Sequence, residues 1–156
     1  MPPAPDTTMT LQQRIESAMR DAMRAGDKRR TLTLRMAMAA AHNRRIELGR
    51  TLADDDVVGV LSKQVKQRRE SAEVYRSAGR EDRAVEEEAE AAILGEYLPD
   101  QLTEAEVEGL ARAAIAETGA SGPGDLGRVM GRLAPQTKGR ADGRVVSDVV
   151  RRLLTG

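Results

Sequence analysis

The sequence predicts an all-α protein made of an N-terminal domain like a four-helix bundle and a small three-helix tail domain. Among its 156 residues are two Tyr and no Phe or Trp, so aliphatic residues and Met must form the core. The common residues Ala, Leu, Arg and Glu favour helices, and strand-forming aromatic residues are nearly absent. We expect a disordered N-terminus over residues 1–9, the first domain over 10–98 and the tail domain over 99–156.

The first two helices are predicted between a capping box and two glycines. The first begins at the capping box of residues 10–13 and ends near Gly26. The second is capped by Asp27 and ends before Gly49. Its centre, residues 32–41, is apolar nearly all round, so we expect this helix to be buried centrally.

Two further helices are predicted over residues 54–78 and 81–98, joined as antiparallel neighbours by a tight turn at Gly79. The third helix starts with three aspartates, residues 54–56, whose negative charge complements the helix dipole. Ala53 stands where a capping Ser or Thr would be usual. Helix initiation is the favoured interpretation of the aspartates, and a metal site is the alternative.

Charged residues interrupt the apolar stripes of the third and fourth helices. The expected stripe of the third helix is Val58, Leu61, Val65, Arg68, Ala72 and Tyr75. Glu87 lies in the stripe of the fourth helix, and Glu90 comes level with Arg68 across the hairpin. A buried charge without a partner is costly. We therefore predict an ion pair between Arg68 and Glu87 or Glu90.

Three shorter helices are predicted in the tail domain. A capping box in residues 103–106 begins the fifth helix, and Gly119 ends it. The sixth begins at residues 121–123 and is expected to break at Pro135. Asp142 can cap the seventh, in which apolar residues recur every three or four positions.

Several functional classes are excluded or disfavoured by composition. The chain has no Cys and one His, His42, so thiolate chemistry is excluded and no metal or catalytic motif is recognisable. No phosphate-binding glycine motif follows a strand. No segment is apolar enough to span a membrane, and the N-terminus lacks signal-peptide features. We expect a cytoplasmic protein with no catalytic residues, metal or cofactor of its own.

The net charge of zero hides an uneven distribution. Residues 11–50 carry ten basic and four acidic residues, whereas residues 81–108 carry one basic and eleven acidic residues. The acidic run over residues 86–90 is typical of a solvated helix face. Its alternatives are docking to a basic partner and internal pairing with the third helix.

A short segment before the last helix has the composition of a phosphate-binding loop. It combines cations with glycines, which let a backbone approach a phosphate closely, and it precedes a helix N-terminus that favours anions. The alternative is that the glycines make turns and Arg140 pairs with Asp142. The candidate nucleic-acid-binding residues are Arg128, Arg132, Lys138, Gly139, Arg140, Gly143 and Arg144.

Several motifs, in order along nearly the whole chain, resemble a known family. Residues 124–130 and 138–143 are similar to the tail domain of the B subunit of glutamine-dependent aminoacyl-tRNA amidotransferase. Residues 65–71, 78–80 and 97–102 look like the stand-alone YqeY family. The resemblance implies a helical domain joined to a tail that engages tRNA, with the amidotransferase catalytic domains absent. A family label of carbon–nitrogen ligase with glutamine as amide donor would then describe chemistry done elsewhere.

Two main functional hypotheses follow. The first is a tRNA-binding module, accessory to the amidotransferase or other translation components, with neither DNA nor a membrane expected as a partner. The second is a protein-interaction adaptor that docks through the acidic fourth helix. A third, weaker option is a subunit of a ligase complex.

Overall fold

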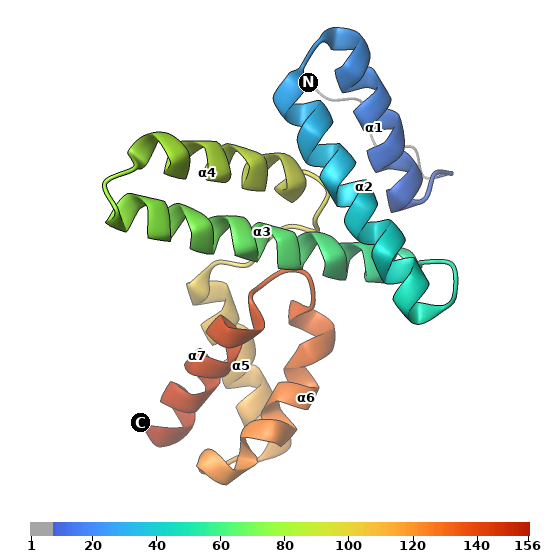
Figure 1. Ribbon diagram of the computed structural model, residues 1–156. Helices are drawn as coiled ribbons and strands as arrows, with labels where there is room; N and C mark the ends of the chain where they lie inside the picture. The colour runs from blue at the N-terminus through green and yellow to red at the C-terminus, as the bar shows by residue number, and fades with distance from the viewer. Residues whose placement is uncertain (1–7) are drawn as a thin grey trace. The chain divides into compact units, whose positions relative to one another are not determined.

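The computed structural model describes residues 8–156 and has seven α-helices and one 3₁₀ turn in that range, with no strand (Figure 1). The all-α prediction is confirmed. The chain divides into two compact units, the first ending at Leu98 and the second spanning Pro99–Gly156. The expected disorder of residues 1–9 falls mostly outside the described residues. No helix in the described part is long and apolar enough to cross a membrane.

The first unit consists of two helical hairpins. Its helices are α1 (Leu11–Ala25), α2 (Lys28–Leu48), α3 (Asp54–Ser77) and α4 (Glu81–Gly95). The hairpin of α1 and α2 crosses that of α3 and α4 in Figure 1, and α2 contacts both α3 and α4. The core between them is aliphatic, with Ile15, Leu34, Leu61 and Leu94 almost fully buried.

The ends of the first two helices agree with the prediction. The Thr10 hydroxyl accepts a hydrogen bond from the Gln13 backbone N–H, and the Gln13 side chain accepts one from the Thr10 N–H. Gly26 and Gly49 end α1 and α2 in the left-handed region, with φ of 73° and 66°, a conformation that glycine adopts without strain.

The expected central burial of α2 is wrong. Leu34, Ala37 and Ala41 are buried, but Leu32 and Met36 are 53% and 46% exposed. The helix packs against α1 on one side and against α3 and α4 on another, which leaves a third side uncovered. An apolar circumference therefore did not mean complete burial.

Two of the three aspartates at the start of α3 have structural partners. Asp54 accepts a hydrogen bond from the Leu11 N–H at 2.9 Å. Asp56 accepts one from the Ala53 N–H at 2.8 Å and binds Arg50 at 2.7 Å. The Arg50 guanidinium, followed by the Ala53 N–H, lowers the pKa of Asp56 to about 2. Helix initiation accounts for this run, and no three potential metal ligands cluster within residues 8–156.

Two details of the second hairpin differ from the prediction. Val57, rather than Val58, is the buried first member of the α3 stripe. The fourth helix ends at Gly95 instead of Leu98, because the next three residues bond back by the tighter three-residue pattern that precedes Pro99. Arg30 of α2 binds the Glu96 carboxylate at 2.5 and 3.1 Å there.

The second unit is a three-helix domain. It contains α5 (Glu104–Thr118), the 3₁₀ turn η1 (Pro123–Asp125), α6 (Leu126–Thr137) and α7 (Gly143–Thr155). Each helix contacts the other two, and their apolar stripes meet in a core that includes Val107, Ala111, Val129, Leu133 and Val150.

The predicted break of the sixth helix at Pro135 is wrong. Pro135 lies in the last turn of α6, which continues to Thr137. Proline removes one backbone donor, but neighbouring groups keep the turn closed. The Lys138 N–H donates to the Ala134 carbonyl at 3.0 Å, and the Thr137 hydroxyl donates to Leu133 O at 3.2 Å.

Candidate nucleic-acid interface

The loop between α6 and α7 is shaped by backbone bonds to the end of α6. The Arg140 and Ala141 N–H groups both donate to the Thr137 carbonyl, at 2.9 and 3.0 Å. Gly139, which lies between Thr137 and these two donors, has a φ of 73°, a value that a residue with a side chain rarely adopts. The loop thus needs Gly139 for its turn, whether or not a phosphate approaches it.

This loop is tied to the segment that precedes α5 by what we call the clasp, residues 100–102 with residues 139–140. The Leu102 N–H donates to Arg140 O at 2.8 Å, and the Gln101 side-chain amide donates to Gly139 O at 2.8 Å. Because of these bonds, the residues of the clasp have a structural role within the second unit. Both segments also belong to motifs on which the family resemblance depends.

Arg140 is the cation of the loop whose guanidinium binds backbone carbonyls. Its Nε donates to the Asp100 carbonyl at 3.1 Å, and its Nη1 contacts the Gln136 carbonyl at 3.4 Å. The expected alternative partner, the Asp142 carboxylate, is not among its hydrogen-bond partners in the described residues. These bonds occupy two of the donors that a phosphate would need, and they assign Arg140 to the clasp.

Lys138 and Arg144 are the outward-facing cations of the loop. Both residues are exposed, and neither side chain has a hydrogen bond or an ion pair within residues 8–156. Gly143, next to Arg144, has open space on its Cβ side. Long, unpaired cations beside an uncovered backbone can contact an anionic polymer without breaking any bond of the fold.

The start of α7 is already capped. The Asp142 carboxylate accepts a hydrogen bond from the Arg144 N–H at 2.9 Å, as its capping position predicted. Its negative charge occupies the place where the expected phosphate would meet the helix dipole. An anion at this loop would therefore bind the Lys138 and Arg144 side chains rather than the helix N-terminus.

The two α6 arginines already have acidic partners. Arg128 binds Asp125 at 2.9 Å, and Arg132 binds Glu117 at 2.8 Å. Arg128 lies ten residues before Lys138, which corresponds to about 15 Å along a helix. Both arginines are more than half exposed, and such surface pairs contribute little stability. In this pairing they differ from Lys138 and Arg144, which have no such pair in the described residues.

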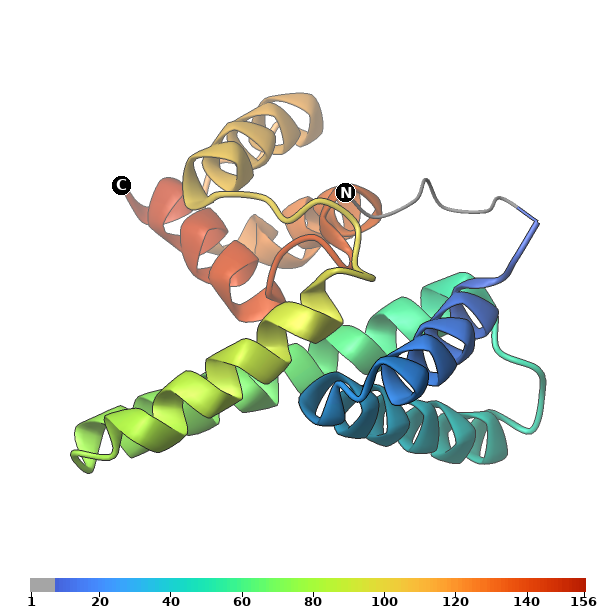
Figure 2. The same cartoon turned by 90° about the horizontal axis from the view of Figure 1, so that it is seen from above.

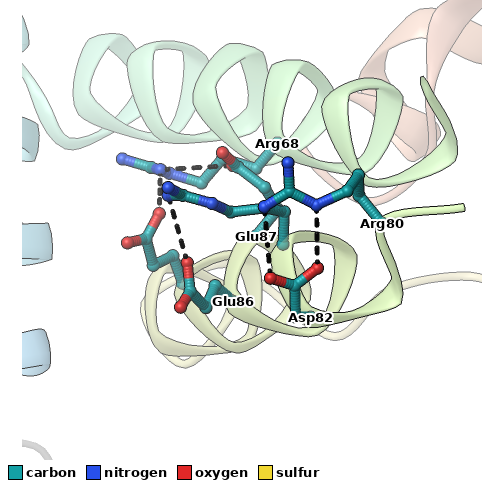
Figure 3. Close-up of polar contacts among 7 residues, drawn as sticks. Arg68, Arg80, Asp82, Glu86 and Glu87 are labelled. Carbon is teal, nitrogen blue, oxygen red and sulfur yellow. Dashed lines mark hydrogen bonds and ion pairs between the residues drawn. The ribbon is translucent and has the colours of Figure 1, made fainter. Parts of the chain in front are cut away.

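The acidic helix α4 is the second charged surface considered from the sequence. Arg68 donates a hydrogen bond to Glu90 and lies 3.6 Å from Glu87. Figure 3 shows Glu87, Glu86 and Asp82 in contact with neighbouring arginine side chains. All six acidic residues of α4 have an arginine partner; they are Glu81, Asp82, Glu86, Glu87, Glu88 and Glu90. Internal pairing therefore accounts for the acidic residues of α4, the third of the alternatives that the sequence left open.

The pairing around Arg68 is partly shielded from water. Its side chain is 11% exposed, and those of Glu87 and Glu90 are 24% and 25% exposed. The Nη2 atom of Arg68 also contacts Met36 Sδ at 3.8 Å, whereas its Nε is buried without a hydrogen-bond partner in the described residues.

His42, the one histidine of the sequence, lies exposed beside Arg45. No potential catalytic partner contacts it in residues 8–156.

Comparison with known proteins agrees with the resemblance seen in the motifs. The family model described as Yqey-like protein matches residues 12–154. The chain belongs to this family. It is also 30% identical over 144 residues to "Altered inheritance of mitochondria protein 41, mitochondrial" of Pyrenophora tritici-repentis (strain Pt-1C-BFP), a match that covers 90% of this chain and 79% of the relative. That relative is named as mitochondrial, whereas the cytoplasm was expected for this chain.

Sequence reasoning missed Gln101 and the role of Arg140. Gln101 bridges the carbonyls of Pro99 and Gly139, both at 2.8 Å. One indication was available in the sequence: Gln101 and Gly139 both belong to motifs that resemble the family, residues 97–102 and 138–143. Spacing alone does not show that segments about 40 residues apart make contact.

Proposed function

We propose that this chain is a tRNA-binding accessory protein of the YqeY-like family. It contacts the RNA backbone through Lys138 and Arg144 and serves glutamine-dependent amidotransfer or another step of translation. This proposal depends on one observation: in the loop between α6 and α7, the exposed cations Lys138 and Arg144 have no partner within the described residues. Family membership supports the same direction.

The chemistry of the loop favours contact with phosphates. The two tyrosines, Tyr75 and Tyr97, are both in the first unit, so the second unit has no aromatic side chain on which a base could stack. Recognition would then depend on RNA shape and backbone. Each phosphate neutralised by a cation releases counterions, so binding should weaken steeply as salt is raised.

The proposed role is binding rather than catalysis. Within residues 8–156, no group of three His, Cys, Asp or Glu side chains is placed to hold a metal, and His42 has only Arg45 beside it. Carbon–nitrogen ligation with glutamine as amide donor would be the work of a partner amidotransferase. This chain would bring or hold the tRNA in the compartment where translation takes place.

A filter-binding titration against total tRNA at several salt concentrations tests the proposal. We expect Lys138→Ala with Arg144→Ala to weaken binding at least tenfold and to reduce the salt slope by about two, one for each lost phosphate contact. The matched control is Arg128→Ala with Arg132→Ala, which removes the same charge from arginines that already have acidic partners.

The control should retain most of the affinity and the slope. If the two double variants lose affinity equally, the contact is diffuse and Lys138 and Arg144 do not form the site. If the unmodified chain binds tRNA with no dependence on salt, or does not bind it, the proposed function is wrong. Circular dichroism should show the same helix content in all variants.

A further inference from the structure

Exposed apolar side chains are concentrated on the first hairpin. Seven large hydrophobic residues are exposed in the described part of the chain, and four of them belong to α1 and α2. These four are Met23, Leu32, Met36 and Ile46, with 46–64% of their surface exposed. Figure 2 shows α2 along an outer edge of the first unit. Exposed apolar area on a folded domain commonly marks an interaction surface.

The exposed face of α2 has the residue spacing of a helix that packs along a second helix. Its exposed residues recur at alternating intervals of four and three positions, which is the heptad pattern of paired helices. From residue 28 to residue 46 this row extends about 27 Å, or five turns. We call the row the seam; it consists of Lys28, Leu32, Arg35, Ala39, His42 and Ile46.

The seam combines apolar side chains with cations that have no acidic partner. Lys28 and Arg35 are exposed, and neither has an ion pair within residues 8–156. The Arg35 guanidinium instead lies against α1, with Nη2 at 3.9 Å from Met23 Sδ. Met36, next to it in the sequence, contacts the Arg68 guanidinium of α3 at 3.8 Å. Arg and Met are both enriched where one protein binds another.

The charge of this face selects an acidic partner. Residues 28–50 contain seven cations and a single acidic residue, Glu47. That carboxylate already binds Arg44 at 2.9 Å. A second copy of the same face would therefore bring like charges together. Carboxylates of another molecule would instead meet cations that are unpaired within the described residues, and such complementarity favours association.

The position of the cations distinguishes a protein partner from a lipid surface. A helix that lies in a membrane interface keeps its cations apart from the apolar face that enters the lipid. Here Lys28 and Arg35 stand on the centre line of the face, on either side of Leu32. Acyl chains covering Leu32 would bury these charges without a counter-charge. In addition, α2 has no Trp or Tyr, the residues enriched at membrane interfaces.

The apolar members of the seam distinguish a protein partner from a nucleic acid. A phosphate backbone pairs with cations but would leave the aliphatic side chains of Leu32 and Ile46 in water. An amphipathic helix with acidic flanks satisfies both kinds of residue. The small side chain of Ala39, between Leu32 and Ile46 along the seam, leaves space into which a larger side chain of that helix can insert.

We propose that the seam of α2 is a docking site for an acidic amphipathic helix of a partner protein. Apolar residues of the partner pack on Leu32, Ala39 and Ile46, and its carboxylates pair with Lys28 and Arg35. This site is independent of the proposed tRNA contact, which uses residues of the second unit.

The binding of two synthetic helical peptides to the full chain tests the proposal. Each peptide has three heptads, or about 32 Å of helix, with Leu at the positions that face α2. The flanking positions are Glu in one peptide and Lys in the other. Fluorescence anisotropy should show saturable binding of the Glu peptide and about tenfold weaker binding of the Lys peptide, since only the Glu peptide offers carboxylates to the seam. Equal affinities, or no binding of the Glu peptide, would overturn the proposal.

Substitutions in the chain locate the contact. Lys28→Glu with Arg35→Glu should reverse the preference, so that the Lys peptide binds about tenfold more tightly than the Glu peptide. Leu32→Glu should weaken the Glu peptide at least about tenfold, because it places a charge in the apolar centre. The matched controls are Arg151→Glu on α7 and Val74→Glu on α3, whose side chains are also largely exposed. Both controls should leave the affinities unchanged.

Three further measurements would assign the seam to another occupant and so refute the proposal. The first is a loss of tRNA affinity in Lys28→Ala with Arg35→Ala that equals the loss in Lys138→Ala with Arg144→Ala. The second is binding to vesicles of phosphatidylserine and phosphatidylcholine that Leu32→Glu abolishes. The third is a dimer in sedimentation velocity that Leu32→Glu dissociates. Circular dichroism should show the same helix content in all variants.

Discussion

The acidic helix α4 and the basic loop before α7 are both runs of like charge in the sequence, yet their side chains do different things. Every carboxylate of α4 meets an arginine of α3, of the turn before α4 or of α4 itself. In the loop, Arg140 binds backbone carbonyls, while Lys138 and Arg144 remain without partners in the described residues. A charge run therefore indicates a binding surface only when its charges are not already neutralised by the fold.

The difference follows from what faces each run. Helix α4 packs along α3, whose cations Arg68 and Arg76 come level with its glutamates. The loop closes the end of a small three-helix domain, where, among its cations in the described part of the chain, Arg140 alone has a side-chain hydrogen bond, and its partners are backbone carbonyls. The predictions below test this contrast, beginning with the largest effect.

Removal of Arg68 should cause the largest loss of stability. Arg68→Met leaves Glu87 and Glu90 without their shared partner in a partly buried position. We expect the free energy of unfolding to fall by roughly 2 kcal/mol, less than for a fully buried pair because solvent screens these carboxylates. Urea denaturation of the full chain measures this change.

Two further variants isolate the cause. Arg83→Met removes an exposed pair with Glu86 and should change the free energy of unfolding by less than about 0.5 kcal/mol. Adding Glu87→Gln and Glu90→Gln to Arg68→Met should recover part of the loss. If Arg68→Met and Arg83→Met lowered the free energy of unfolding equally little, the Arg68 pairing would contribute no more stability than an exposed surface pair.

Disruption of the clasp should have an intermediate effect. Arg140→Ala and Gln101→Ala each remove hydrogen bonds to backbone carbonyls, and each should cost about 1 kcal/mol of unfolding free energy. Hydrogen exchange at the Leu102 amide, which donates to Arg140 O, should become faster in both. Lys138→Ala should change neither quantity; destabilisation by Lys138→Ala would mean that this cation also belongs to the fold.

The smallest effect should come from Asp56, whose carboxylate Arg50 and the Ala53 N–H stabilise in its charged form. Its folded pKa of about 2 lies below its ordinary value of 3.8. This contribution is therefore complete above pH of about 4 and is lost as the pH falls toward 2. Asp56→Asn should flatten the pH dependence of the urea midpoint in that interval, whereas Asp55→Asn should leave it unchanged. Equal slopes in the unmodified chain and Asp56→Asn would contradict the assignment.

Local rules predicted the helices well. The capping boxes at Thr10 and Thr103 and the stops at Gly26, Gly49 and Gly119 all occur where expected, because these signals act over three or four residues. Pro135 did not break α6, since neighbouring donors closed the last turn around it. The apolar centre of α2 did not predict its burial, because burial depends on which faces the other helices cover.

The same distinction holds for the candidate site. Residues 138–144 alone show that the loop is rich in cations and glycines. The sequence does not show that Arg140 binds the Asp100 carbonyl while Lys138 and Arg144 stay exposed. This difference depends on a contact between segments 40 residues apart. Helical spacing across one tight turn was short-range enough to place Arg68 level with Glu90, so that pairing could be anticipated.

The sequence by itself determined the all-α class, the positions of most helix ends and the charge of each segment, because these depend on neighbouring residues. Only the tertiary structure decided which charges are neutralised, which side of α2 stays uncovered and which residues hold the clasp. Those outcomes depend on what packs opposite each side chain, and distant parts of the chain supply those partners.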